Sequence, residues 1–263
     1  MLRPPFEASV YWDEADWARF MAGRADLITV LTAMRDSDFP AWLKTLTAAD
    51  AGRVDSLAAR FATLDIISEQ ERLLGRPLDP EIEVDLLWFC KPHGVRVQGQ
   101  RFIGHYTYDD AVMVKVAAHE ILHPPFPMDG PTAKACLAVL AADPLFARIL
   151  AEKDKGTGYN DLEGILNEDV CQALDQIIQE RLGIVQAAPA ARWTRADQGM
   201  HVLAAGLYGW FKVDGYDRTG GNLEAWMSAA AASGRLSPGQ LHPMAAAVLN
   251  KPVDQLWTTP PAG

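Results

Sequence analysis

The sequence predicts an α+β protein that is mostly helical and has a small antiparallel sheet before one central helix. Two changes in pattern lead to this prediction. Apolar residues recur at helical spacing through most of the first 75 residues. Residues 81–88 and 95–106 then show the alternation that is typical of strands, and helical patterns return after them.

The length and the apolar content permit a substantial core. The chain has 263 residues, of which 49% are hydrophobic. The patterns divide it into a helical N-terminal segment (1–80), a core that carries the main motif (81–185) and a C-terminal helical lobe (186–263).

Charge and cysteine content exclude some classes of function. The net charge of −10, without clusters of Lys or Arg, is unfavourable for binding nucleic acid. Cys90, Cys136 and Cys171 are odd in number, and no Cys-x-x-Cys pair occurs. We therefore expect reduced thiols in a reducing compartment rather than disulfides.

The sequence predicts no association with a membrane. It has no run of about 18 apolar residues. Its first residues also lack the apolar stretch of a signal peptide. We expect a cytoplasmic protein, although a chain whose leader had been removed would give the same pattern. No pattern specifies an oligomeric state.

Helices are expected throughout the N-terminal segment. Asp13 is placed to cap a helix that begins near Glu14. Further helices are expected over residues 39–46 and 48–74, and Gly75 ends the last of them. We find no chemical motif here, so a packing or shielding role is expected.

The predicted sheet follows. Residues 81–88 form one strand, and residues 95–97 and 101–106 form a hairpin. His93 and His105 fall in or beside these turns, and we expect them to be structural residues rather than metal ligands.

The central helix carries the strongest motif in the chain. Thr107 or Asp109 can cap it, and residues 111–118 are apolar nearly all round, which predicts burial on several sides. Residues 119–123 read HEILH, and Pro124 follows directly, so His123 falls in the last turn.

His119 and His123 are four residues apart, which places both imidazoles on one face of a helix. Buried imidazoles need partners for their nitrogens, and one divalent ion can serve both. Glu120 then lies where a carboxylate can accept a proton from water at the ion.

A catalytic zinc ion takes three protein ligands. Another helix is expected from residue 161 to Gly183, and it offers Glu163 and Glu168 as the third ligand. Helical angles place Glu163 near the apolar stripe, and place Glu168 on a polar stripe with Gln172 and Asp175. This argument alone favours Glu163 as the inward carboxylate.

The HEILH motif resembles the H-E-x-x-H signature of zincin metallopeptidases. The run LNEDVCQAL (residues 166–174) resembles the Asn-Glu-Gly helix of the gluzincin group. It is also similar to the Glu-Glu-Gly-Ile-Cys-Gln run of plant LIM-containing, ubiquitin-activated peptidases. The two matching helices are a small part of the chain.

The resemblance implies a zinc site formed by His119, His123 and Glu168, with Glu120 as the general base. It also implies that the substrate main chain lies along a sheet edge over the metal. Two positions depart from the gluzincin pattern: Asp169 replaces a glycine, and Gln172 stands where many members have an acid.

Other residues are candidates for supporting roles. Asp175, one turn beyond Gln172, is a candidate for orienting a histidine ligand. Residues 185–191 are expected to be a linker, and residues 196–210 a helix. His201, Tyr208 and Tyr216 are the available donors to a substrate oxyanion, although a structural role is expected for each.

The sequence thus predicts a zinc-dependent peptidase acting on a peptide or protein substrate. Zinc is preferred on geometry and availability, since these ligand types also hold other divalent ions. Two alternatives remain: a regulatory or interaction protein that binds zinc without catalysis, and a helical protein with a chance motif.

Overall fold

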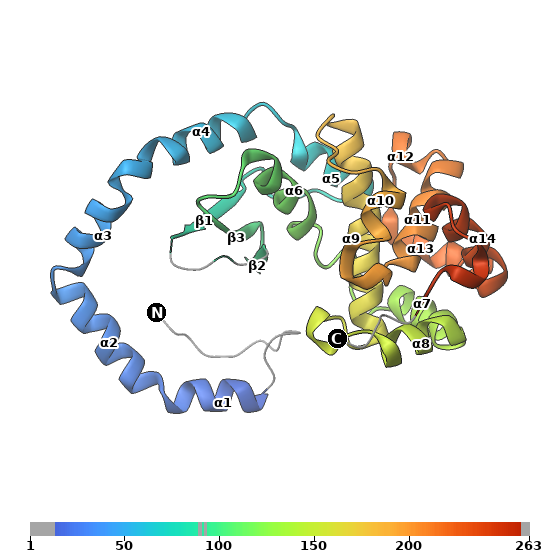
Figure 1. Cartoon of the computed structure of the whole chain (residues 1–263), viewed down its shortest axis with the longest axis horizontal. Helices are drawn as coiled ribbons and strands as arrows, with labels where there is room; N and C mark the ends of the chain where they lie inside the picture. The colour runs from blue at the N-terminus through green and yellow to red at the C-terminus, as the bar shows by residue number, and fades with distance from the viewer. Residues whose placement is uncertain (1–13, 89–90, 92–93, 259–263) are drawn as a thin grey trace. The chain divides into compact units, whose positions relative to one another are not determined.

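The computed structural model describes residues 14–88, 91 and 94–258, and it is mostly helical, as predicted (Figure 1). The chain divides into two compact units, Met1–Ser56 and Leu57–Gly263. Within the described residues, none of the helices has the length and apolar character needed to cross a bilayer.

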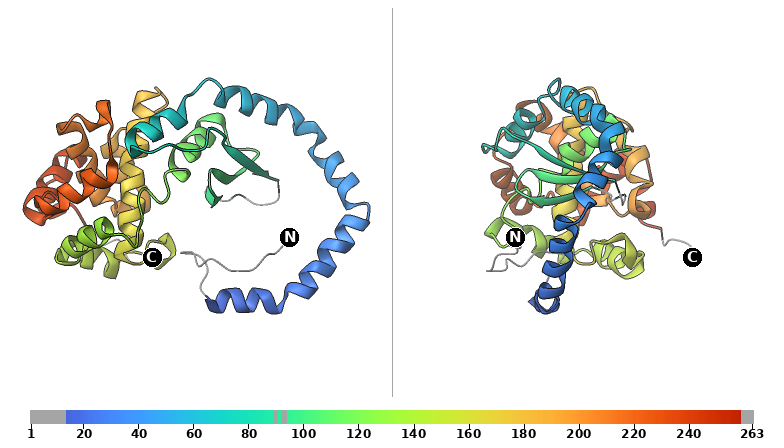
Figure 2. Two further views of the ribbon diagram at one scale, coloured as in Figure 1. Left: turned by 180° about the vertical axis from the view of Figure 1, so that it is seen from behind. Right: turned by 90° about the vertical axis from the view of Figure 1, so that its left-hand side faces the viewer.

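The first unit contains three helices in succession. They are α1 (Glu14–Ala22), α2 (Arg24–Asp36) and α3 (Phe39–Thr47), followed by the short η1 (Ala48–Asp50). The predicted helix start near Glu14 is confirmed. No side chain of α1, α2 or α3 is buried. Both views show these helices following one another in single file rather than packed side by side (Figure 1, Figure 2).

The single helix predicted over residues 48–74 is two helices in the structure. They are α4 (Ala51–Phe61), which crosses the boundary between the units, and α5 (Ile66–Leu74). Asp65 separates them because its Oδ1 accepts a hydrogen bond from the Ser68 amide at 3.2 Å and so starts a new helix. Gly75 ends α5 in the left-handed conformation, as predicted.

The small sheet has strands β1 (Glu83–Leu87), β2 (Val95–Gln98) and β3 (Arg101–His105), in the order β1-β3-β2. The predicted hairpin of β2 and β3 is confirmed as antiparallel. The prediction of a wholly antiparallel sheet was wrong, because β1 pairs with β3 in parallel. Strand β3 is the central strand, and its Phe102 is fully buried. Strand β2 is at an edge of the sheet, and its Val95 and Val97 are exposed.

The central helix, α6 (Asp110–Glu120), begins at the predicted cap, where Asp109 Oδ1 accepts from the Val112 amide at 2.7 Å. It ends at Glu120, so His123 lies outside it rather than in its last turn. The His123 amide donates to Glu120 O at 3.3 Å, which is a tighter turn than that of an α-helix. Pro124 cannot continue the helix because it has no amide hydrogen.

Helix α9 (Leu162–Arg181) lies at the centre of the second unit and packs against α5, α6, α7 and α11 (Figure 1, Figure 2). Almost every residue from 165 to 179 is buried, polar residues included. The remaining elements are α7 (Pro131–Ala141), α8 (Pro144–Glu152), η2 (Lys155–Thr157), α10 (Pro189–Trp193), η3 (Ala196–Gly199), α11 (Val202–Val213), α12 (Tyr216–Thr219), α13 (Leu223–Ala232), α14 (Pro238–Leu249) and η4 (Val253–Gln255).

Two C-terminal segments differ from the prediction. Helix α10 occupies part of the expected linker. The expected helix over 196–210 is interrupted, because Asp197 and Gln198, inside η3, have φ values of 45° and 63°. A helix cannot continue through residues with positive φ, so His201 lies at the start of α11 instead of within a helix.

Helix α5 connects α6 to the C-terminal helices. Gln70 Nε2 lies 3.2 Å from the carbonyl oxygens of both Ala117 and Ala118, which precede the HEILH motif. At the other end of α5, the Tyr216 hydroxyl donates to Leu73 O at 2.5 Å. These side chains supply donors to carbonyl groups near helix ends, and they fix α6 within the unit.

Gly75 and Gly183 form a matched pair for testing this packing. Both follow a helix with φ near +68°, at 69° and 67°. A Cβ atom at Gly75 would lie 2.3 Å from Gly221 O, whereas one at Gly183 would meet nothing within 4 Å. Gly75→Ala should therefore lower the free energy of unfolding by about 1–3 kcal/mol more than Gly183→Ala. Denaturant unfolding measures both losses, and equal losses would contradict the close approach.

Candidate metal centre

Three predicted ligands converge on one point. The Nε2 atoms of His119 and His123 are 3.0 Å apart, and each lies 3.4 Å from Glu168 Oε2. His119 lies in the last turn of α6, His123 follows the helix, and Glu168 comes from α9. The structure therefore brings Glu168 to two histidines that precede it by 45 and 49 positions.

The geometry of this cluster fits a small divalent cation. Zinc binds imidazole nitrogen and carboxylate oxygen at about 2.0–2.2 Å. A triangle with sides of 3.0, 3.4 and 3.4 Å has points at that distance from all three corners, slightly off its plane. Two imidazoles and one carboxylate are also a ligand set of catalytic zinc sites, which keep one position open.

His119 is oriented by Asp175. The Nδ1 atom of His119 lies 2.7 Å from Asp175 Oδ2, so Nδ1 carries a hydrogen, and Nε2 is the nitrogen that presents a lone pair to the cluster when the ring is neutral. Asp175 is fully buried. Burial alone would raise the pKa of Asp175, but Arg192 and His119 lower it to about 2. Asp175 therefore faces His119 as a carboxylate.

His123 has different partners. Its Nδ1 lies 3.1 Å from Asn167 Oδ1 and 3.4 Å from Cys171 Sγ, both on α9. The Asn167 carbonyl accepts from Nδ1 and so directs Nε2 towards Glu168. Burial opposes a charge on this ring, but Cys171 and Glu168 beside it raise the pKa of His123 to about 10.

Of the two candidate glutamates on α9, Glu168 is buried and Glu163 is exposed at the first turn. Gln172 Nε2 donates to Glu168 Oε1 at 2.7 Å, which leaves Oε2 for the two histidines. Burial would raise the pKa of Glu168, but the adjacent His119 and His123 hold it well below its usual value. The helical angles failed here because they assume one buried face, and α9 is covered on several sides.

Glu120 lies beside the same cluster. Its Oε2 accepts a hydrogen bond from the backbone amide of Arg96, on β2, at 3.0 Å. Burial raises the pKa of Glu120, and His119 and His123 partly offset this effect. A Cβ atom at Gly94 would lie 3.4 Å from Glu120 Oε1, so the glycine leaves room around the second oxygen.

The electrostatics of the cluster favour a cation. Burial would lower the pKa of His119, yet Glu168 and Asp175 raise it well above its usual value. Two buried carboxylates thus demand positive charge between them, and protons on the imidazoles supply it. A divalent cation would replace those protons, because histidine must be neutral at Nε2 to bind a metal.

His105, which was expected to be structural, does not join the cluster. His105 Nδ1 lies 2.7 Å from the Thr107 hydroxyl and accepts from the Thr107 amide at 3.2 Å. Among the described residues, the set that could hold a metal does not include His105. His93 lies outside the described residues.

The three candidate oxyanion donors have structural partners. His201 lies between Asp169 Oδ1 at 2.6 Å and Asp197 Oδ2 at 2.7 Å. The Tyr208 hydroxyl donates to Glu180 at 2.7 Å, and that of Tyr216 donates to a backbone carbonyl. Each of them connects α9 or α5 to the C-terminal helices.

Arg192 and Trp193 were not predicted to belong to the site. Both are on α10, and both donate to the side chain of Gln172. The sequence around them carries no periodic signal, because α10 has only five residues. The one available signal was the polar stripe of α9 itself, whose buried members require partners from elsewhere.

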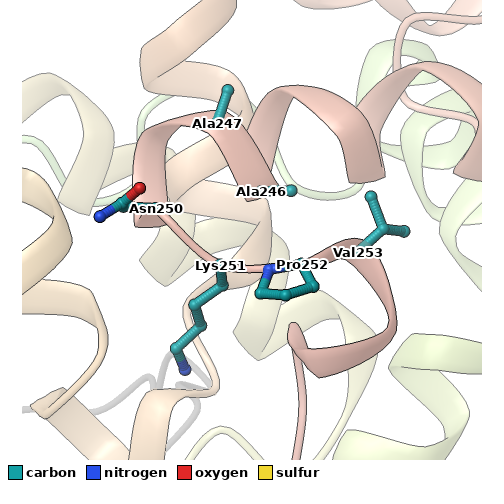
Figure 3. Close-up of a pocket in the computed structure, with 6 residues that line it drawn as sticks. All are labelled: Ala246, Ala247, Asn250, Lys251, Pro252 and Val253. Atoms are coloured by element: carbon teal, nitrogen blue, oxygen red, sulfur yellow. The ribbon is translucent and has the colours of Figure 1, made fainter.

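A separate surface pocket lies at the C-terminal end of α14 (Figure 3). It contains no histidine or carboxylate, and it shares no residue with the metal centre. Its lining residues are Ala246, Ala247, Asn250, Lys251, Pro252 and Val253. We assign no chemistry to it.

Comparisons with protein families, curated proteins and solved structures found no match to this chain.

Replacing each candidate glutamate tests the third ligand. Loss of a residue that hydrogen-bonds to a metal ligand typically weakens metal binding by about 10–100-fold. Glu168→Gln removes a proposed ligand itself, so it should weaken zinc binding by more than that. Glu163→Gln is the matched control on the same helix and should leave the zinc dissociation constant unchanged. Competition with a chromogenic chelator measures both constants. Weaker binding in the Glu163 variant alone would reverse the assignment.

The buried His201 predicts a pH-dependent stability. Burial would lower its pKa, but Asp169 and Asp197 raise it to about 10. A folded-state pKa above the unfolded value of about 6.5 means that protonation stabilises the fold. This contribution is complete below about pH 6.5 and is lost as the pH rises towards 10.

His201→Gln should therefore lower the free energy of unfolding by more than about 1 kcal/mol at pH 6, and by less as the pH rises. Denaturant unfolding of the metal-free protein at pH 6 and pH 9.5 measures the difference from the unsubstituted protein. A difference that is independent of pH would contradict a charged His201.

Proposed function

We propose that this protein is a zinc-dependent metallopeptidase in which His119, His123 and Glu168 hold the metal and Glu120 is the general base. The observation that carries the proposal is the approach of the three ligand atoms to within 3.4 Å of one another beside the half-buried Glu120. The H-E-x-x-H spacing and the Asn-Glu helix, which suggested the same residues, support it independently of the geometry.

Zinc supplies Lewis acidity, which polarises a carbonyl group and lowers the pKa of water towards neutrality. The remaining steps belong to Glu120. Its carboxylate accepts a proton from the attacking water and returns it to the leaving amine, so no covalent bond to the protein forms. The Arg96 amide fixes Oε2, which leaves Oε1 for this transfer.

The strand beside Glu120 is best suited to an extended peptide as the substrate. Strand β2 is at the edge of the sheet, and the amide of its Arg96 already contacts Glu120. Val95 and Val97 of the same strand are exposed. A peptide added along such an edge would form main-chain hydrogen bonds close to the proposed base.

A non-catalytic zinc-binding protein is the alternative. The observation that favours it is the end of α6 at Glu120, which leaves His123 outside the helix. Such a protein would bind zinc through the same three side chains but would hydrolyse no peptide. Metal content and peptide turnover, measured on one preparation, separate the two functions.

Substitution of the proposed base tests the enzyme. Glu120→Gln should reduce turnover of a mixed peptide library by about 10²–10⁴-fold, because the amide cannot accept a proton. Zinc should remain bound at one equivalent, since Glu120 is not a ligand. Metal analysis and mass spectrometry of the peptide products measure these two properties.

Glu163→Gln serves as the control variant, because Glu163 is exposed and outside the cluster. Turnover retained in the Glu120 variant would overturn the assignment of the base. Zinc absent from the unsubstituted protein would overturn the metal site, and zinc without turnover would favour the alternative.

A further inference from the structure

Arg192 makes a set of contacts that leads back to two of the three proposed ligands. Its side chain is 9% exposed, and it pairs with both oxygens of Asp175, with Nη2 at 2.8 Å from Oδ2. Its Nη2 also donates to Gln172 Oε1, and its Nη1 donates to Gln176 Oε1 at 3.1 Å. All these acceptors are on α9, whereas Arg192 comes from α10 beyond the loop that follows α9.

The first path runs through Asp175 to His119. Asp175 Oδ1 accepts from Arg192 and from Gln179 at 3.1 Å, and Oδ2 accepts from Arg192 and His119. Four donors around one buried carboxylate leave it a single orientation. That orientation keeps the hydrogen of His119 on Nδ1 and the lone pair of Nε2 towards the cluster.

The second path runs through Gln172 to Glu168. Gln172 Oε1 accepts from Arg192 and from Trp193 Nε1, the latter at 3.3 Å. With its carbonyl held by two donors, the amide must present Nε2 to Glu168 Oε1. This contact leaves Glu168 Oε2 facing the histidines. An acid at position 172 would instead set two carboxylates against each other.

Helix α10 is itself fixed in the core. Trp193 is fully buried and packs edge-on against Tyr208, with ring centroids 5.6 Å apart. The Arg192 guanidinium lies 5.8 Å from the centre of the Trp193 ring. A side chain anchored in this way loses little freedom when it forms further hydrogen bonds.

We propose that Arg192 is the positioning residue of the metal centre, which orients His119 through Asp175 and Glu168 through Gln172. This inference rests on the proposed metal site but not on peptidase activity. The planar fork is essential to the role, because one guanidinium reaches a carboxylate and an amide at once. Lysine would supply the charge without the fork.

The test is zinc affinity in solution, measured by chelator competition on the full chain. Arg192→Met and Arg192→Lys should each raise the zinc dissociation constant by about 10–100-fold, as loss of an outer contact does in other metal sites. Arg181→Met is the control: Arg181 is the last residue of α9, and it pairs with Glu69 at 2.6 Å rather than with the cluster. It should leave the constant unchanged.

Cobalt substitution provides a spectroscopic test of position. The visible absorption of Co²⁺ reports the geometry of its ligands, so Arg192→Lys should change that spectrum and Arg181→Met should not.

Gln172→Met removes only the second path. If Arg192 acts partly through Gln172, the double variant should lose less zinc-binding free energy than Arg192→Met and Gln172→Met lose in total when measured separately.

The outcomes are distinct. If Arg192→Lys binds zinc and cobalt as the unsubstituted protein does, the positioning role is wrong, even where Arg192→Met fails to fold. If the unsubstituted protein binds zinc but cleaves no peptide, the proposed peptidase activity is wrong and the zinc affinities still decide this inference. If the unsubstituted protein binds no zinc, both are wrong.

Discussion

The buried polar face of α9 is the constraint on which the second unit depends. Glu168, Asp169, Asp175, Gln176 and Gln179 are all at most 3% exposed on one helix. A buried charge without a partner is strongly unfavourable, so helices packed against α9 must bring donors to these side chains. The same hydrogen bonds that permit α9 to be buried therefore also set which helices surround it and where their side chains point.

Helices α6, α10 and α11 meet this demand differently. Helix α6 brings His119 to Asp175, and α10 brings Arg192 to the same carboxylate. At the start of α11, His201 and the Ala204 amide hold Asp169, the amide at 3.1 Å. The candidate metal centre is thus one part of a continuous network, and Asp169, which departs from the gluzincin pattern, has a structural role in that network.

Local signals in the sequence predicted the parts of the fold that depend on local chemistry. The start after Asp109, the stop at Gly75 and the hairpin before α6 follow from a cap and from turn residues. The HEILH motif marked a region where the structure brings His119 and His123 to Glu168.

What depended on distant contacts could not be predicted in this way. Pairing of β1 with β3 rather than β2 depends on which strand is buried by the rest of the unit. The helical angles of α9 could not separate Glu163 from Glu168, because a helix covered on several sides has no single inward face. Arg192 had no local signal, since its hydrogen-bond partners on α9 are 16 to 20 positions away.

The composition of this network bears on its purpose. Replacing a buried ionic network by well-packed apolar residues is often neutral or stabilising, by about 1–4 kcal/mol, so stability alone is a weak reason for such a network. The positioning of His119 and Glu168 is a stronger reason for it. A carboxylate that keeps a hydrogen on His119 Nδ1, and an amide that turns one oxygen of Glu168 towards the histidines, both act on atoms of the cluster. Apolar side chains could fill the same space, but they could not set the direction of those lone pairs.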